Sequence, residues 1–289
     1  MSEFEESEFR GPLFNQLEKG NHLLWEPGQV FEKSIGIDRA SFSTNQYLWD
    51  LYCETGYLNG VILRNRHFRY IWSGTPPGKT LPDFSLNLFI QAKRGYYSKR
   101  GKSSLISKGI KGQHWFFEIT PHQQIALEKL ALDLGDDALV VYASPLFHEQ
   151  QQLYNHTKNQ TIVENSTFPK AIALKGHSKW YYDKPGMSGV ANPDFSFVEG
   201  PDLFTEIKMK REVKGDMGQN SSKSIEILSE RIDKFVDSQS NDFRSTQYIY
   251  WIGNIDRYPQ LYGGDSPKLK NYLKIETFVA LWKLQWLIF

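Results

Sequence analysis

The sequence predicts a mixed α/β protein built around a central sheet. Its clearest support lies between residues 43 and 143, where helix and strand patterns follow one another in the order helix, strand, strand, strand, helix, strand. The chain has 289 residues, of which 40% are hydrophobic, and this is enough to bury a sizeable core. No repeat of fixed period and no low-complexity tract points to a repetitive or disordered architecture.

The first helix of this region is expected at about residues 44–55. Ser43 and Gln46 match a capping box, and Gly56 stands where a helix commonly ends in glycine. Residues 56–72 are typical of strands with a turn near Asn59 and Gly60, and the GTPPGKT segment that follows is a loop.

The remaining elements of the first half have clear boundaries. Residues 81–94 predict one or two strands, and QHWFFEI, residues 113–119, predicts another. A helix should begin after Thr120, with Pro121 in its first position, and end near Gly135. The ALVVYAS segment, residues 138–144, is then a buried strand.

The second half has a different composition, rich in His, Asn, Tyr and Lys up to residue 192. We expect helices at about 201–213 and 222–237, a strand at 245–253, and a core or interface element at the apolar end of the chain, residues 278–289. The predicted organisation is an N-terminal arm (1–40), an α/β core (41–145) and an α+β accessory or specificity region (146–289).

Composition limits the functional classes. Lys and Arg number 34 against 33 Asp and Glu, so attraction to a polyanion must come from local clusters of charge. The single cysteine, Cys53, excludes an internal disulfide and a cysteine-rich zinc site, and the acidic start is no secretory signal, so a cytoplasmic location is expected. The apolar residues 278–289 are too few to span a bilayer, and no membrane role is expected.

The strands within residues 81–94 carry polar groups with a chemical pattern. Asp83 follows a proline at a strand start, and Gln91 and Lys93 lie two residues apart, so their side chains leave the same face. Polar groups on an apolar strand must be satisfied or functional. Oxygen ligands suit a hard cation such as Mg²⁺, and a lysine beside it can assist an attacking water.

The D-x7-Q-x-K pattern, between a helix and a helix–strand unit, resembles the PD-(D/E)xK nuclease superfamily in its (D/E/Q)xK variant. The string IQAKR is similar to the Mrr-like restriction endonucleases, and the resemblance covers about residues 43–143. It implies a restriction-endonuclease-like mixed sheet flanked by helices, with Asp83 as metal ligand, Gln91 as ligand or ligand-positioner, and Lys93 as catalytic lysine.

Members of this superfamily usually add a glutamate from the first helix, and Glu54 is the expected residue. A rotation of about 100° per residue places Glu54 on the same helical face as Tyr47 and Leu51. The expected metal ligands are therefore Asp83, Glu54 and Gln91, with Mg²⁺ or Mn²⁺ as the cofactor.

A basic segment begins at the proposed catalytic lysine. Between residues 93 and 111 there are seven cations and no acid, interleaved with tyrosines. Cations suit phosphates and aromatic rings suit unpaired bases. The expected nucleic-acid-binding residues are Arg94, Tyr96, Tyr97, Lys99, Arg100 and Lys102, with Gln124 at the start of the next helix. A solvated loop is the ordinary alternative.

Two other arrangements compete for the site. Asp194, Glu206 and Lys208 also fit the superfamily pattern, but the residues around Glu206 have helical spacing, which would point Glu206 and Lys208 apart. His148, His156 and His177 with nearby asparagines are a weaker match to an HNH metal site. No phosphate-binding glycine-rich motif is present.

The sequence therefore favours a metal-dependent DNA endonuclease of restriction or anti-phage defence, with double-stranded DNA as substrate. An ATPase or other defence-system subunit, or a second copy of the chain, is the expected partner by analogy of fold alone. The alternative is a non-catalytic nucleic-acid-binding module with a degenerate nuclease core.

Overall fold

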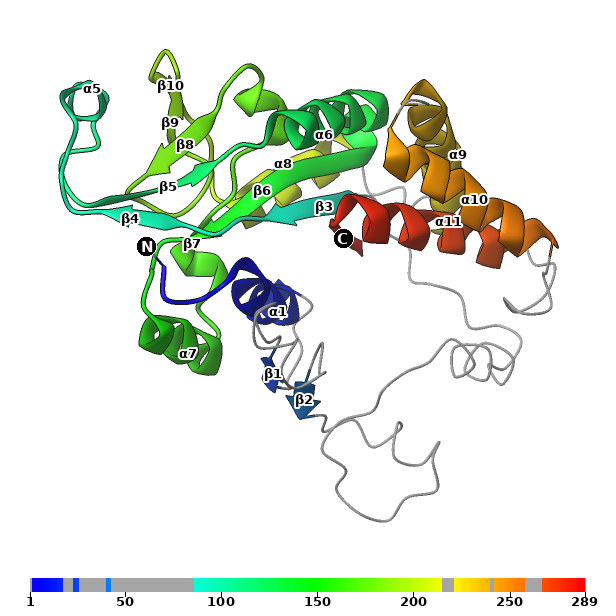
Figure 1. The fold of residues 1–289 in the computed structure, drawn as a ribbon, viewed down its shortest axis with the longest axis horizontal. Coiled ribbons are helices and arrows are strands. Elements are labelled where there is room, and N and C mark those ends of the chain that lie inside the picture. Colours follow the sequence, from blue (N-terminus) through cyan, green and yellow to red (C-terminus); the bar gives the residue numbers. More distant parts are fainter. Residues whose placement is uncertain are drawn as a thin grey trace.

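The computed structural model describes residues 2–17, 23–25, 40–42, 86–214, 221–239, 242–257 and 267–288. These residues form a mixed α/β fold, as the sequence predicts (Figure 1). The expected helix at 44–55, the strands at 56–72, and the residues Glu54 and Asp83 lie outside the described ranges.

The central sheet combines parallel and antiparallel pairs. Its strand order is β11 (Gln285–Ile288), β3 (Asn87–Ala92), β6 (Ala138–Pro145) and β7 (Ser166–Thr167), and only the β3–β6 pair is parallel. Every residue of β3 and β6 is buried. Burial on both faces is what parallel strands require, because helices must cover each side.

Alternate residues of β3 face two different cores. Phe89 packs with α6 (Pro121–Leu134) and with helices α9 (Ser221–Ser238) and α11 (Pro267–Trp282), whereas Leu88 and Ile90 pack with α1 (Glu6–Leu17). Figure 1 shows α6 and α1 on opposite sides of the sheet. Two further helices, α7 (Gln150–Asn159) and α8 (Leu203–Lys214), contribute to the α1 side.

The helix and strand that follow the Gln-x-Lys motif are confirmed at the expected boundaries. Helix α6 has Thr120 as its N-cap residue and Pro121 in its first turn, and Gly135 ends it with a φ of 54°. A positive φ costs glycine little, which explains why the helix stops there. The predicted buried strand is β6.

A second, antiparallel sheet has the order β10 (Ser196–Val198), β9 (Gly189–Asn192), β8 (Lys179–Tyr182), β5 (His114–Glu118) and β4 (Tyr96–Ser98). The predicted strand at 113–119 is β5. Strand β9 passes close to β8, because a Cβ at Gly189 would lie 2.4 Å from the Trp180 ring. Short helices α5 (Ser103–Ile106), η1 (Gly135–Asp137), η2 (Val163–Asn165) and η3 (Ala171–Leu174) complete this half.

The strand predicted at 245–253 is wrong, because these residues belong to α10 (Phe243–Arg257). Ser245, Tyr248 and Ile255 are buried in α10, and Tyr248 packs with residues of α9 and α11. A short run rich in Tyr, Ile and Trp has high β propensity, but packing against neighbouring helices overrides that preference. The helices predicted near 201–213 and 222–237 are confirmed as α8 and α9.

Both ends of the chain contribute to the core. Phe9, Leu13 and Leu17 recur every four residues on α1 and are buried, so the expected arm contains a core helix. Pro12 within α1 hid this pattern. The apolar segment 278–289 supplies the end of α11 and then β11, which pairs with β3.

The two short strands β1 (Leu23–Trp25) and β2 (Ala40–Phe42) form a separate antiparallel pair. Among the described helices, none is long and apolar enough to cross a membrane.

Candidate active site

Lys93 is held in one place immediately after β3. Its amide donates a hydrogen bond to the Ala143 carbonyl at 2.7 Å, which continues the pairing of β3 with β6. Its Nζ donates to Oε1 of Gln123, in the first turn of α6, at 2.6 Å. The same Nζ lies 5.7 Å from the centroid of the Tyr142 ring on β6. Strand, helix and ring together fix the position of this ammonium group.

The surroundings of Lys93 favour its neutral form more than water does. Burial lowers the pKa of the Lys93 ammonium, and the opposing attraction of Glu6 is the smaller effect. A lysine with a lowered pKa is more readily deprotonated and can accept a proton from a nucleophile.

Glu6, in the first turn of α1, is the acid that the structure brings to Lys93. Burial raises the pKa of its carboxyl group, although three cations, Lys93, Arg10 and Lys283, and a hydrogen bond from the Arg94 amide all act in the opposite direction. Sequence reasoning missed this residue. The wheel argument that selected Glu54 would have found it, because Glu6 shares a helical face with Phe9 and Leu13.

Gln91 offers a buried oxygen with no partner. Its side chain leaves β3 on the same face as Lys93, and the residue is 3% exposed. Its Nε2 donates to the Ala92 carbonyl at 3.2 Å, but within the described part of the chain its Oε1 accepts no hydrogen bond. A buried acceptor left in this state costs about 1–3 kcal/mol, which a cation at the site would offset.

These groups fit the donor chemistry of Mg²⁺. A carboxylate from Glu6 and an amide oxygen from Gln91 are hard oxygen ligands, and Mg²⁺ keeps several waters in addition to a few protein oxygens. No group of three or more His, Cys, Asp or Glu side chains assembles among the described residues. Of the expected site residues, the structure describes Gln91 and Lys93, which face the α6 side of the sheet, and Glu6 of α1 is close enough to Lys93 to act on its pKa.

Gln124 supports the site from behind. It is buried, with its Oε1 accepting from the Tyr142 hydroxyl at 2.8 Å and its Nε2 donating to the Ala171 carbonyl and to Glu128, each at 2.8 Å. These bonds orient the ring beneath Lys93. Gln124, which was expected to contact nucleic acid, is therefore buried in the interior. Gln123 is the glutamine that contacts Lys93.

Arg94 points to the N-terminal segment. Its guanidinium donates a hydrogen bond to the Ser2 carbonyl, while the Ser2 hydroxyl donates to the Gly95 carbonyl at 2.5 Å. The Glu3 amide adds a bond to the His148 carbonyl at 2.8 Å. Arg94 therefore ties residues 2–3 to the end of β3, directly before the helix turn that carries Glu6.

The competing motif does not form a site. As the spacing indicates, Glu206 and Lys208 lie on α8 and point apart. Glu206 is buried and pairs with Lys170 at 2.7 Å, whereas the Lys208 side chain is 78% exposed. Asp194 lies elsewhere, 62% exposed and 3.4 Å from His177.

Removing the competing acid and lysine is therefore expected to leave activity unchanged. Asp194→Ala combined with Lys208→Ala should retain any activity of the Lys93 site, because neither side chain touches that site. Comparison of initial rates for wild type and variant checks this. A large loss in this variant would transfer the active site to the second half of the chain.

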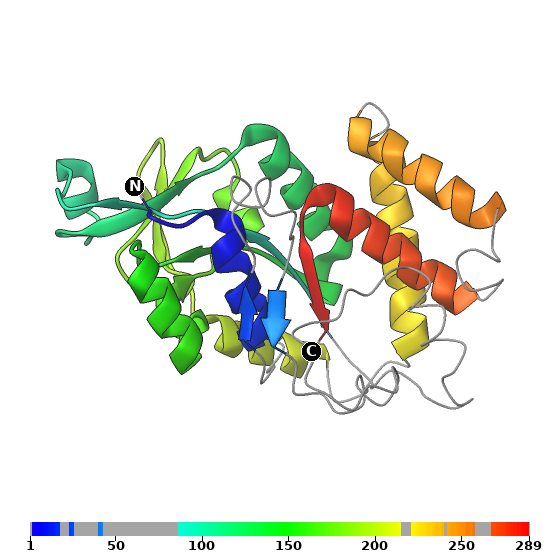
Figure 2. The same ribbon diagram turned by 60° about the horizontal axis from the view of Figure 1, so that its bottom comes forward.

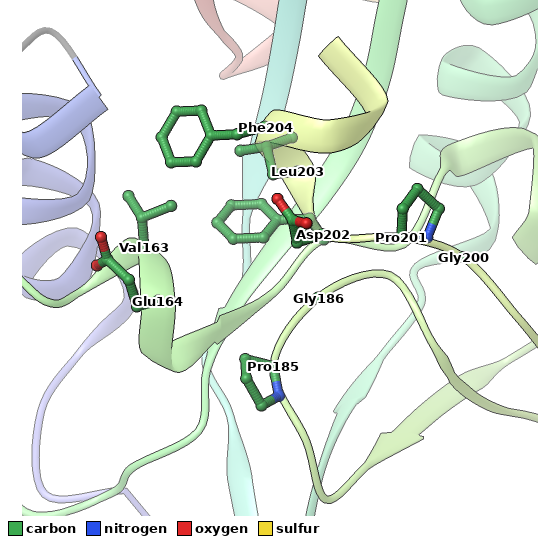
Figure 3. Close-up of a pocket in the computed structure, with 10 residues that line it drawn as sticks. Val163, Glu164, Pro185, Gly186, Gly200, Pro201, Asp202, Leu203 and Phe204 are labelled. Atoms are coloured by element: carbon green, nitrogen blue, oxygen red, sulfur yellow. The ribbon is translucent and has the colours of Figure 1, made fainter. Parts of the chain in front are cut away.

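A cavity of about 350 Å³ lies beside α8 and is largely apolar. Figure 3 shows Phe204 and Leu203 over it, with Glu164 and Asp202 at its border. Both acids are engaged, Glu164 by the Gln16 amide at 2.7 Å and Asp202 by the first turn of α8. Gln16 is ten residues from Glu6, about 15 Å along the axis of α1, so Glu164 at the border of the cavity contacts the opposite end of α1 from Glu6.

Comparison with protein-family models, curated proteins and solved structures finds no match for this chain.

Proposed function

We propose that this protein is a metal-dependent endonuclease of the PD-(D/E)xK type that hydrolyses phosphodiester bonds in DNA. The observation that carries the proposal is the group at the end of β3. Lys93 has a lowered pKa and follows β3 on the same face as the unpartnered Gln91 oxygen, and the half-buried Glu6 is close enough to oppose that lowering. Few structural roles need a lysine with a lowered pKa and an unpartnered amide oxygen on one face of a strand end, because each is costly to bury.

The chain's own residues divide the work of hydrolysis. Glu6 and Gln91 would hold Mg²⁺ or Mn²⁺, which when bound stabilises negative charge on the phosphoryl oxygens. Lys93 receives a proton from the attacking water as its oxygen bonds to phosphorus. The opposite phosphorus–oxygen bond breaks, and the leaving oxygen takes a proton from solvent. The resulting ammonium group lies beside the product phosphate and offsets its charge.

Asp83 and Glu54 remain proposed metal ligands, since one carboxylate is a sparse set for Mg²⁺. We further propose a cytoplasmic role in restriction or anti-phage defence, with control by an ATPase, another defence subunit or a second copy of the chain. Unregulated cleavage would damage the host's own DNA.

Metal removal tests the proposal directly. Supercoiled plasmid should be nicked or linearised with Mg²⁺ or Mn²⁺ and remain intact in EDTA. Asp83→Ala and Glu54→Gln should each reduce the rate with metal, and Asp38→Ala, an acid two residues before β2 in the sequence, serves as a comparison. Retention of plasmid in a shift assay without cleavage in either metal would replace the nuclease by the non-catalytic binding module.

A further inference from the structure

The hairpin of β4 and β5 extends from the Lys93 site as an arm, residues 96–118, with α5 at its tip (Figures 1 and 2). A small core of its own supports it. Leu105 and Ile110 from the arm are buried against Tyr181 and Val190 of the second sheet. Side chains on this arm are therefore displayed on a packed scaffold.

The arm carries uncompensated positive charge. Its five cations are all exposed, and they are Lys99, Arg100, Lys102, Lys108 and Lys111. The sequence has no acid between Lys93 and Glu118. Glu118 itself pairs with Lys179 on β8 at 2.8 Å, and within the described ranges none of the five cations has an ion pair. On a chain of net charge +1, this is a strongly local feature.

The tyrosine rings at the base of the arm are already stacked on protein. Tyr96 stacks on Phe116 with centroids 5.4 Å apart. Tyr97 stacks on His148 at 3.9 Å and contacts Trp115 at 5.2 Å. Binding of unpaired bases needs open ring faces, so these rings suit a structural role better than the predicted stacking with nucleic acid. Recognition of a ligand by the arm would therefore depend on its exposed cations.

We propose that the arm binds the phosphate backbone of double-stranded DNA on one side of the cleavage point. This substrate assignment rests on the nuclease function proposed for Lys93, although the binding itself is measurable without cleavage. Lys99 is six residues beyond Lys93, so the two are at most about 20 Å apart, the span of an extended chain. At about 3.4 Å per base pair, Lys99 would contact phosphates within roughly six base pairs of the scissile bond.

Salt-dependent binding in EDTA tests the proposal. Anisotropy of a labelled duplex of about 30 base pairs is measured between about 50 and 200 mM NaCl. Lys108→Ala combined with Lys111→Ala is compared with wild type and with Lys223→Ala combined with Lys234→Ala, two exposed lysines of α9. Each lost phosphate contact should lower the salt slope by about 0.9, so the arm variant should lose about 1.8 and the α9 variant nothing.

Competition between nucleic acids for the protein is the second measurement. Unlabelled duplex DNA should displace the probe at lower concentration than single-stranded DNA or duplex RNA of the same length. An arm variant with the wild-type slope, or preferential binding of a single strand or RNA, would overturn the proposal. If only the proposed nuclease function is wrong, plasmid will stay intact with Mg²⁺, but the salt slope of duplex binding will still be smaller in the arm variant than in wild type.

Discussion

Replacing Lys93 is expected to reduce the rate of DNA cleavage by about 100- to 10 000-fold, the range for loss of a general acid–base group. Lys93→Met is the sharpest variant, because its unbranched apolar chain still covers the Tyr142 ring while the nitrogen is lost. Binding of duplex DNA in EDTA should change by a factor of about 2 or less, since one phosphate contact at most is removed. The measurement is single-turnover cleavage with Mg²⁺.

The matched control is Lys208→Met, on an exposed side chain of α8. It should cleave at the wild-type rate. Thermal unfolding of both variants separates a folding defect from a chemical one, since Lys93→Met removes a buried charge but also the Gln123 hydrogen bond and the attraction to Glu6. Cleavage by Lys93→Met within a factor of about ten of wild type would remove Lys93 from the mechanism.

The fold was predictable where one local pattern determined each element. Thr120, Pro121 and Gly135 set the limits of α6 from neighbouring residues alone, and an unbroken apolar run identified β6. Prediction was wrong at 245–253, where the same aromatic run fits a strand or a helix and only the packing of α10 against α9 and α11 decides. Long-range pairing, such as β11 with β3, leaves no local signal.

In the candidate site, too, residues placed by a local pattern were predictable and those placed by long-range packing were not. Gln91 and Lys93 lie on one strand, so their common face could be inferred from the period of two. Glu6 comes from a helix 85 residues earlier, and its approach to β3 depends on the buried apolar face of α1 and on the bond from Arg94 to Ser2. Adjacent residues on a helix point about 100° apart, which is why Gln123 meets the lysine and Gln124 lies in the interior.

Glu6→Gln is expected to abolish metal-dependent cleavage while it raises the free energy of unfolding of the metal-free protein at neutral pH, a typical trade between function and stability. Burial raises the pKa of the Glu6 carboxyl group despite the nearby cations, so the folded protein favours the neutral form more than the unfolded chain does, and glutamine is its neutral isostere. Denaturant unfolding in EDTA measures the change in the free energy of unfolding.

The sign of the pH dependence follows from that raised pKa. As pH rises from about 4, Glu6 ionises first in unfolded chains, and wild type loses stability relative to Glu6→Gln until the pH exceeds the folded-state pKa. Below about pH 4 both carry a neutral side chain and their stabilities converge. Added Mg²⁺ should raise the melting temperature of wild type and leave that of Glu6→Gln unchanged, because a cation that binds only the folded state stabilises it. Equal responses of the two proteins to Mg²⁺ would show that Glu6 is not a metal ligand, and a stability difference that persists at low pH would show that its cost is not one of charge burial.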